Sequence, residues 1–422
     1  MNLSSKLYTL LYFYFPIVYL FFLINTFGGE LGILDGIITI VIPFLVFFAS
    51  LSSINNREVN LLFSFFIIYT ILTGLNFIDS DFSLYYNDLL NYVIPMFFMF
   101  VGLSFHSNPN RLFDSILKYG TVALAIGLIL YFTMPGWYQN HLMDLRSSQG
   151  KDVDYGMSDD SLLTLFTRIV GIFKNTYGCV YTAVVVLCIT AGKLMKDNKT
   201  SNLSAMLCLL ISTLCILTSG CRGPVLASII VLIVIVIYLF SHKTSGFVIY
   251  LILILIAVSF ISDFVLLRSI SSFERSFTFE GAIGEREQQW LSVFDNFNSY
   301  IFGDGVGAYG HAAYYKTGIA ITDNNWMKIF AETGIVGFAY FIFIYIGALI
   351  KGYKRKNNKC VELLILVSYG IMMIGANPLS FKNIFAIPFW YCIGSIFNKN
   401  KNTHQINSYE KCSHFTLNLQ RK

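Results

Sequence analysis

Apolar runs of about twenty residues recur along almost the whole chain. A helix of that length crosses the hydrocarbon core of a bilayer, and the spans are predicted at 8–27, 32–51, 59–78, 84–105, 112–132, 177–195, 203–218, 223–240, 246–262, 326–350, 361–377 and 383–397. Charged residues make up 13% of the chain, against roughly 25% in soluble domains. Residues 1–422 are therefore predicted to form a single integral-membrane domain, an all-α polytopic membrane protein with about 12 transmembrane helices.

Two connections between these spans are long, residues 133–176 and 263–325. Cytoplasmic loops carry the excess of Lys and Arg. With the N-terminus inside, the cytoplasmic segments hold most of the 29 basic residues and few of the 24 acidic ones. We therefore expect both termini, including the basic tail 398–422, in the cytoplasm, and both long loops outside.

Ionisable residues are scarce within the predicted spans. Asp35 and Asp88 lie near predicted outer ends. An ion-coupled transporter or a flippase usually needs charged groups or broken helices at membrane depth. Their scarcity counts against a transporter and directs attention to the outer loops.

No metal or cofactor site emerges from the sequence. The six histidines are scattered, and the eight cysteines form no CxxC pair. Two D-x-D triplets, Asp79–Asp81 and Asp152–Asp154, have the carboxylates to hold a divalent cation, but short acidic loops are common on an outer face. We expect no metal and no cofactor.

Arg222 lies in a short outward turn, Thr218–Pro224, between two apolar helices. The small residues around it leave the guanidinium room to meet a ligand, and Pro224 suits the first turn of the next helix. The alternative is an interfacial arginine that pairs with lipid headgroups.

The first long loop ends in the segment Ser161–Phe173, whose apolar residues share one helical face. This pattern predicts an amphipathic helix on the membrane surface, with Arg168 on its aqueous side. A surface helix that merely seals the bundle has the same pattern.

The second long loop contains three features. Arg286 and Trp290 are four residues apart, on one face of a predicted helix. The glycine run Gly303–Gly307 would let the backbone approach a phosphate, or it is a flexible turn. The loop closes with Asp323 and Asn324, which either cap the next helix or present a carboxylate at the mouth of the bundle. Within that helix, Gly334 and Gly337 favour close helix packing.

The order of these elements resembles that of the O-antigen polymerase and O-antigen ligase superfamily. The likeness rests on Arg168-Ile-Val-Gly171-Ile-Phe173-Lys-Asn175, on Ser219-Gly-Cys-Arg222-Gly223, on Arg286-x-x-x-Trp290 with Gly303-x-Gly305-x-Gly307, and on Asp323-Asn324 with Glu332-x-Gly334-x-x-Gly337. The sequence departs from the family pattern at two positions. Cys221 replaces the usual small hydroxyl residue, and Asp323 stands where the ligases have His, which favours a polymerase.

The resemblance implies a GT-C-like membrane glycosyltransferase in the bacterial inner membrane. A polymerase transfers the growing glycan from undecaprenyl pyrophosphate onto a new lipid-linked repeat unit at the periplasmic face. A ligase transfers it to lipid A–core. The expected partners are the lipid-linked oligosaccharide, membrane lipid and a chain-length regulator protein, with no nucleic acid. A polysaccharide or lipid flippase is the alternative of another class.

On this reading, specific residues acquire roles. Arg222 and Arg286 are expected to hold the pyrophosphate and stabilise its developing charge, because guanidinium groups bind phosphate bidentately. Asp323 is the candidate to orient or deprotonate the acceptor hydroxyl. Substrate binding is expected from Arg168, Asn324, Trp290, Gly305 and Gly307.

Overall fold

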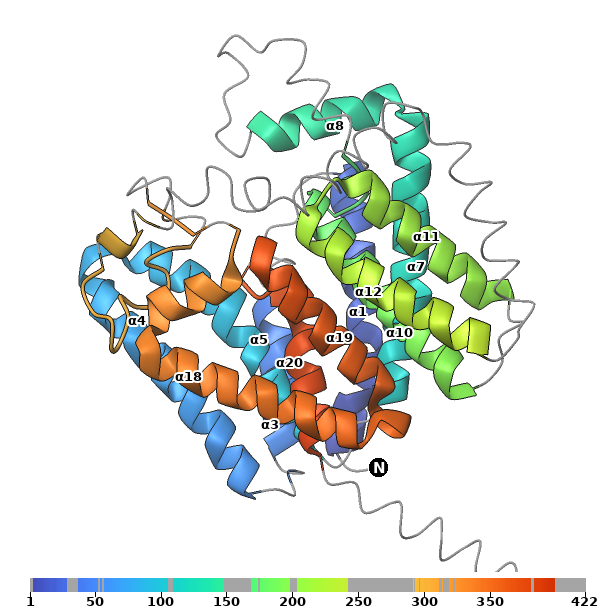
Figure 1. The fold of residues 1–422 in the computed structure, drawn as a ribbon. Helices are drawn as coiled ribbons and strands as arrows, with labels where there is room; N and C mark the ends of the chain where they lie inside the picture. Colours follow the sequence, from blue (N-terminus) through green and yellow to red (C-terminus); the bar gives the residue numbers. More distant parts are fainter. Residues whose placement is uncertain are drawn as a thin grey trace, which may run out of the picture.

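The computed structural model describes most of the predicted helical segments. The described residues are 3–28, 37–51, 54, 57–104, 109–147, 168–173, 175–197, 203–241, 291, 293–295, 297–310, 313, 319–321, 323–380 and 383–398. Within these ranges the chain forms helices and irregular segments, with no β-strand and one isolated β-bridge, Ile54 to Ser104. The predicted all-α class is confirmed for this part of the chain (Figure 1).

The helices follow the apolar runs closely. They are α1 (Leu3–Gly28), η1 (Ile37–Val41), α3 (Ile42–Leu51), α4 (Arg57–Asp88), η2 (Leu89–Val93), α5 (Ile94–Met96), α6 (Phe98–Leu103), α7 (Pro109–Thr133), α8 (Gly136–Ser147), α10 (Thr176–Asp197), α11 (Leu203–Ser219), α12 (Arg222–Ser241), α18 (Asn325–Lys354), α19 (Lys356–Gly375) and α20 (Asn383–Phe397). Every predicted span overlaps helical structure except 246–262, which lies outside the described residues.

Several of these helices have the length and composition of membrane spans. Among the described residues, five are long and apolar enough to cross a membrane: 57–75, 110–133, 176–196, 325–354 and 356–375. Five shorter apolar helices accompany them. The chain is thus a multi-pass membrane protein, while the number of twelve spans and the GT-C-like architecture stay predictions.

α4 reverses direction along its length. A straight helix would separate residues 14 apart by about 21 Å. Yet the Tyr85 hydroxyl donates to the Ile71 carbonyl at 3.5 Å, and the Tyr85 ring touches Gly74. The chain therefore turns back between these residues, in agreement with two separate predicted spans at 59–78 and 84–105.

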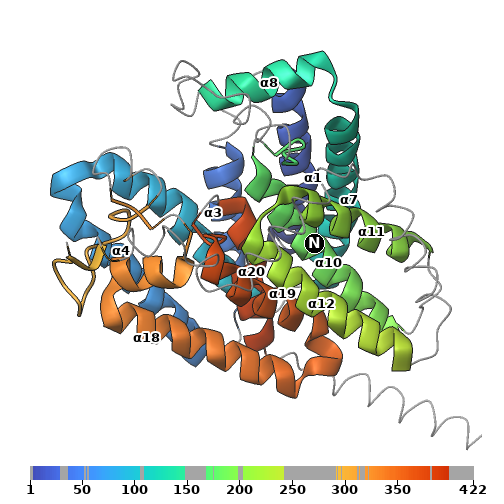
Figure 2. The same ribbon diagram turned by 45° about the horizontal axis from the view of Figure 1, so that its top comes forward.

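The centre of the bundle is formed by α10 and α20. Every residue from Gly178 to Gly192 and from Ile384 to Ile396 is buried, and α20 lies among the other helices in both Figure 1 and Figure 2. α20 crosses α6 closely at Gly102 and Gly394, where an added Cβ would collide with the partner backbone. Small residues allow such close crossings inside a membrane protein.

α8 lies across one end of the bundle, opposite the N-terminus (Figure 1). Its Trp137 ring packs against Phe27 at the end of α1, with a centroid distance of 4.7 Å. The neighbouring Tyr138 hydroxyl donates to the Gly171 carbonyl at 3.0 Å. This helix was not predicted, since the sequence analysis treated 133–176 as a loop. The end formed by α8, residues 168–173 and the turn between α11 and α12 is called the α8 end.

The amphipathic helix predicted for Ser161–Phe173 is wrong over residues 168–173, which are not helical. Residues 161–167 lie outside the described residues. Gly171 has φ +59°, outside the range of a right-handed helix, and packs so closely on Gly127 that an added Cβ would lie 3.0 Å from the Gly127 Cα. The segment is held instead by Ile169, whose N–H donates to the Thr218 carbonyl at 3.2 Å. Arg168 itself is exposed, as expected.

Basic residues gather at the opposite end. The α10 and α19 backbones meet there, at Gly192 and Val361, and the Lys193–Asp114 ion pair joins α10 to α7. The helix termini that meet at this end carry Arg57, Arg111, Lys193, Lys196, Lys351, Lys354, Arg355, Lys356 and Lys359. We call it the basic end.

α18 is broken at Gly334, which has φ +65° and ψ −175°. The sequence analysis assigned this glycine to close helix packing; instead it interrupts the helix after a first half, residues 325–333. An interruption frees backbone groups that need partners away from water. The carbonyls of Ala331 and Glu332 accept from the N–H groups of Asp304 (3.0 Å) and Gly305 (2.9 Å).

The other freed groups are satisfied as well. The Thr333 carbonyl accepts from the Tyr69 hydroxyl at 2.9 Å. On the far side of the break, the Ile335 N–H donates to the Tyr300 carbonyl at 2.9 Å, and the Val336 N–H donates to that of Ile301 at 3.3 Å. The segment 300–305 therefore fills the break in α18.

We predict that Gly334→Ala destabilises the protein. The positive φ alone costs a residue with a Cβ about 1–3 kcal/mol, and the new methyl group would collide with the Ile301 carbonyl oxygen. The midpoint of thermal unfolding in detergent should fall. Gly136→Ala is the control, because no atom lies within 4 Å of an added Cβ there. Equal midpoints for the two variants would contradict the described break.

Candidate functional site

Three segments of the α8 end carry predicted site residues. Arg168 begins the segment 168–173, Arg222 begins α12, and Asp323 precedes α18. The first two are joined by the hydrogen bond from the Ile169 N–H to the Thr218 carbonyl, one turn before the α11–α12 connection. Residues from distant parts of the sequence therefore meet at one end of the bundle.

The turn that carries Arg222 has a tight, defined backbone. Gly220 has φ +62°, and the Cys221 N–H donates to the Ser219 hydroxyl oxygen at 3.2 Å. An added Cβ at Gly223 would lie 3.1 Å from the Met372 carbonyl oxygen, so the turn packs directly on α19. Arg222 is half-buried between these helices. The small residues around it allow the close packing of this turn.

The pKa of the Cys221 thiol depends on the charged groups around it. Burial raises the pKa of the Cys221 thiol to about 11, while the positive charge of Arg168 lowers the pKa and the negative charge of Asp323 raises it. Both charged groups thus lie within electrostatic reach of one thiol. This places Arg168, the Arg222 turn and Asp323 in one cluster.

Asp323 and Asn324 have different roles. The Asn324 side-chain oxygen accepts from the Met327 N–H at 3.1 Å and caps α18. Asp323 instead accepts a hydrogen bond from the Tyr177 hydroxyl, with 3.4 Å between the two oxygens. Of the two predicted candidates for the helix cap, the structure therefore selects Asn324, and its binding of substrate stays a prediction.

Tyr177, in the first turn of α10, was missed by the sequence analysis. A tyrosine at the start of an apolar helix is common at a membrane interface, so the sequence alone gives it no special role. Its ring packs 5.9 Å from that of Tyr181, one turn deeper in the bundle. Tyr177 thus links the Asp323 carboxylate to the buried core.

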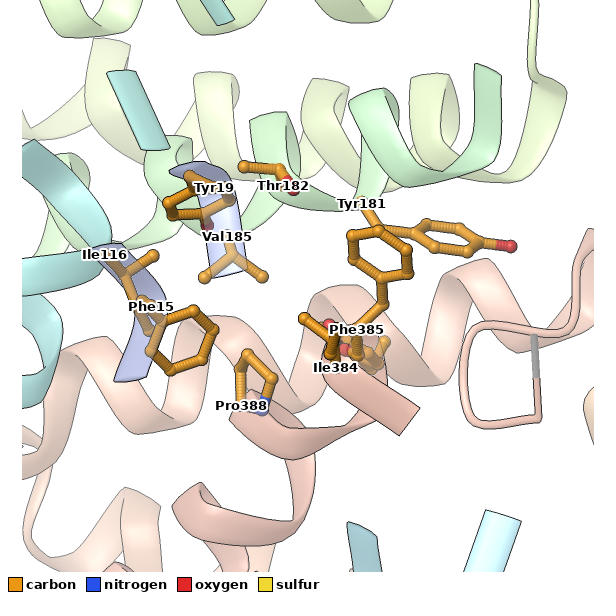
Figure 3. A pocket seen from close by; sticks show the side chains of 10 residues that line it. Phe15, Tyr19, Ile116, Tyr181, Thr182, Val185, Ile384, Phe385 and Pro388 are labelled. Carbon is orange, nitrogen blue, oxygen red and sulfur yellow. Dashed lines mark hydrogen bonds between the residues drawn. The ribbon is translucent and has the colours of Figure 1, made fainter. Parts of the chain in front are cut away.

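A narrow crevice lies deeper, among α1, α7, α10, α19 and α20 (Figure 3). Aromatic and aliphatic side chains line most of it, together with the hydroxyl-bearing Tyr19, Tyr181, Thr182 and Tyr369. It contains no charged side chain and none of the predicted site residues. The crevice therefore holds none of the charges of the α8 end, although Tyr181 in its lining packs against Tyr177.

The predicted glycine run has partners within the protein. The Gly305 N–H donates to the Glu332 carbonyl at 2.9 Å, and the Gly307 N–H donates to the Glu332 carboxylate at 3.2 Å. Both glycines are buried. They fasten the segment to α18, so a phosphate contact of their N–H groups stays a prediction that this geometry does not favour.

Arg286 and Trp290 lie outside the described residues. Their predicted roles stay predictions.

A buried ionic cluster beside α18 was also missed. The Lys328 ammonium lies 2.6 Å from Asp88 Oδ2 and 3.3 Å from Glu332 Oε1. A signal was present in the sequence, because Lys328 and Glu332 are four residues apart within an otherwise apolar run. Asp88 was noted only as a residue near an outer end.

Comparison with known families confirms the resemblance for part of the chain. Residues 207–342 match the family model described as O-antigen ligase. The matched segment includes the Arg222 turn, the glycine run and Asp323, whereas Arg168 precedes it. No curated protein matches the chain. This segment thus resembles the O-antigen polymerase and ligase superfamily, which supports a membrane enzyme of the O-antigen ligase or polymerase type.

The proximity of Arg168 and Asp323 to Cys221 predicts opposite effects on thiol alkylation. Arg168→Ala should raise the pKa of Cys221 and slow its alkylation at pH 9, whereas Asp323→Asn should lower the pKa and speed it. Below the pKa, each half unit changes the thiolate fraction about threefold. Mass spectrometry of the Cys221 peptide gives the rate, and Arg111→Ala at the basic end is the control. Shifts of the same sign in both variants would contradict the cluster.

Proposed function

We propose that this chain is a surface-polysaccharide polymerase, which transfers a growing glycan from undecaprenyl pyrophosphate onto a new lipid-linked repeat unit. The transfer breaks the bond between the anomeric carbon and the pyrophosphate oxygen, and it forms a glycosidic bond to the acceptor hydroxyl. The acceptor loses a proton, and undecaprenyl pyrophosphate leaves. The superfamily match over residues 207–342 supports this class of reaction.

The observation that carries the proposal is the meeting of Arg168, the Arg222 turn and Asp323 at the α8 end. A guanidinium keeps its charge at any working pH and pairs with phosphate oxygens through two parallel hydrogen bonds. Arg222, together with Arg286, would stabilise the negative charge that develops on the pyrophosphate. Arg168 would position the acceptor.

Asp323 supplies the opposite chemistry. Its carboxylate, held by the Tyr177 hydroxyl, would accept a hydrogen bond from the attacking hydroxyl of the acceptor and draw off its proton. Because Asn324 caps the helix, the carboxylate of Asp323 is not needed for that purpose.

The distribution of charge supports a periplasmic site in the bacterial inner membrane. The basic end carries nine of the described basic side chains. At the α8 end the only described basic side chains of known burial are the exposed Arg168, the half-buried Arg222 and the buried Lys328. Since Lys and Arg accumulate on the cytoplasmic side, the α8 end would face the periplasm, and both chain termini would lie in the cytoplasm.

The second candidate is a ligase that transfers the glycan to lipid A–core. The description of the matched family favours it. Asp323 favours the polymerase, because the ligases have His at this position. An imidazole exchanges a proton near neutral pH, and a carboxylate does not have this property. A flippase stays the alternative of another class, because the break in α18 and the buried charges of Lys328, Asp88 and Glu332 are features that transporters also use.

Gene deletion tests the proposal. Without a polymerase, a separate ligase still transfers single repeat units, so the cell surface should carry one repeat unit instead of a ladder. Wild-type protein should restore the ladder, and Arg222→Ala or Arg286→Ala should not. One phosphate–guanidinium pair at 4 Å is worth roughly 4 kcal/mol at an effective dielectric near 20, which corresponds to about a thousandfold in rate. A silver-stained gel gives the result.

Analysis of the lipid-linked pool distinguishes the two candidates. Bare core, with polymer accumulated on undecaprenyl pyrophosphate, would show that the chain is the ligase. A wild-type ladder in both arginine variants would show that these residues only anchor the protein at the interface.

A further inference from the structure

The ionic cluster of Asp88, Lys328 and Glu332 lies outside the charges used in the proposed mechanism. All three residues are almost fully buried, with side-chain exposures of 5%, 2% and 1%. Lys328 Nζ donates to Asp88 Oδ2 at 2.6 Å and lies 3.3 Å from Glu332 Oε1. It also lies 5.7 Å from the centre of the Tyr92 ring. Buried charges are costly unless they are paired in this way.

This cluster joins three parts of the chain. Asp88 ends α4, while Lys328 and Glu332 lie in the first half of α18. The Glu332 carboxylate also accepts from the N–H groups of Gly307 and Tyr309, at 3.2 and 3.3 Å. Gly310 packs directly on Asp88, where an added Cβ would collide with the carboxylate. The cluster therefore fastens the segment 303–310 and the half-helix 325–333 to α4.

The half-helix carries Asp323 at its start. Lys328 lies little more than one helical turn after the capping residue Asn324, and Gly334 interrupts α18 just beyond Glu332. Because of this interruption, the rest of α18 does not hold the half-helix rigidly in line. Its orientation depends on its contacts with neighbours, of which Lys328–Asp88 is the ionic contact to α4 and the Tyr69 hydroxyl to the Thr333 carbonyl is a neutral one.

We propose that Lys328, paired with Asp88 and Glu332, is a positioning residue that sets the place of Asp323 in the site. The proposal rests on the proposed function, because its effect is measured on glycan transfer. Lys328 touches no substrate. It acts through the half-helix, and the transfer step is sensitive to small displacements because a shift of about 1 Å lowers a rate by up to about a hundredfold.

Asp88→Ala and Asp88→Asn test the proposal as a pair. Asp88→Ala removes the ionic contact to α4 but leaves Lys328 paired with Glu332, so the remaining charges are neutralised. Asp88→Asn keeps an oxygen that can accept from the Lys328 ammonium. The matched control is Lys359→Met, which removes a similar ion pair, Lys359 to Glu362 at 2.9 Å, at the basic end.

The full-length protein is assayed in lipid nanodiscs with undecaprenyl-pyrophosphate-linked repeat units from the deletion strain. We expect Asp88→Ala to lower kcat by about tenfold or more while KM changes less than about twofold. Asp88→Asn should restore most of kcat, and Lys359→Met should keep the wild-type value. Amide hydrogen exchange of peptides from 303–310 should be faster in Asp88→Ala alone.

A folded Asp88→Ala protein with wild-type kcat would overturn the proposal, as would an equal loss in Lys359→Met. If Asp88→Ala does not fold, Asp88→Asn/Lys328→Met replaces it. That variant keeps Glu332 with its two N–H donors and the same net charge as the native cluster, and wild-type kcat in it would again overturn the proposal. Arg222→Ala tests the proposed function separately from the role of Lys328. If Arg222→Ala transfers glycan at the wild-type rate, the proposed function is wrong, whatever the Asp88 variants do.

Discussion

The break in α18 at Gly334 is the constraint on which the α8 end depends. A helix interrupted inside an apolar bundle leaves backbone carbonyls and N–H groups that water cannot reach. Here the segment 300–305 satisfies them, together with the Tyr69 hydroxyl. The break therefore requires a second segment, and that segment belongs to the second long loop, 263–325. This requirement brings a loop and a half-helix to one place.

The buried charges follow from the same arrangement. Glu332 lies just before the break, and its carboxylate accepts from the N–H groups of the inserted loop. A carboxylate buried in this way needs a counter-charge, which Lys328 supplies, and Lys328 in turn pairs with Asp88. Together these contacts hold the half-helix whose N-terminus presents Asp323 beside Tyr177 and Cys221. Backbone satisfaction, ion pairing and site geometry are thus linked in one region.

The positions of the helices could be predicted because the length of an apolar run is enough to indicate a membrane-spanning helix. α7, α10 and α20 begin and end within three residues of the predicted spans. The grouping of Arg168, Arg222 and Asp323 was predicted only through the family resemblance. The hydrophobic pattern of a sequence predicts helices, but it does not predict which distant loops lie close together.

Other features depend on tertiary contacts that the pattern does not contain. The amphipathic pattern up to Phe173 suggested a helix, but Gly171 has a left-handed backbone and packs closely on Gly127. α8 was missed because its composition is mixed and it lies across the end of the bundle. Gly334 carries no sequence signal that separates a helix break from close packing. Glu332 and Lys328 were readable as an i, i+4 pair, but Asp88, their partner, is 240 residues away from Lys328.

On the proposed function, this chain joins lipid-linked repeat units without another enzyme. The most direct measurement is the reaction of the purified protein with undecaprenyl-pyrophosphate-linked repeat units as the sole substrate. We expect glycan chains of several repeat units that stay attached to lipid, with one undecaprenyl pyrophosphate released for each bond formed. Release of the lipid pyrophosphate only when lipid A–core is added, with no lipid-linked polymer formed, would contradict it.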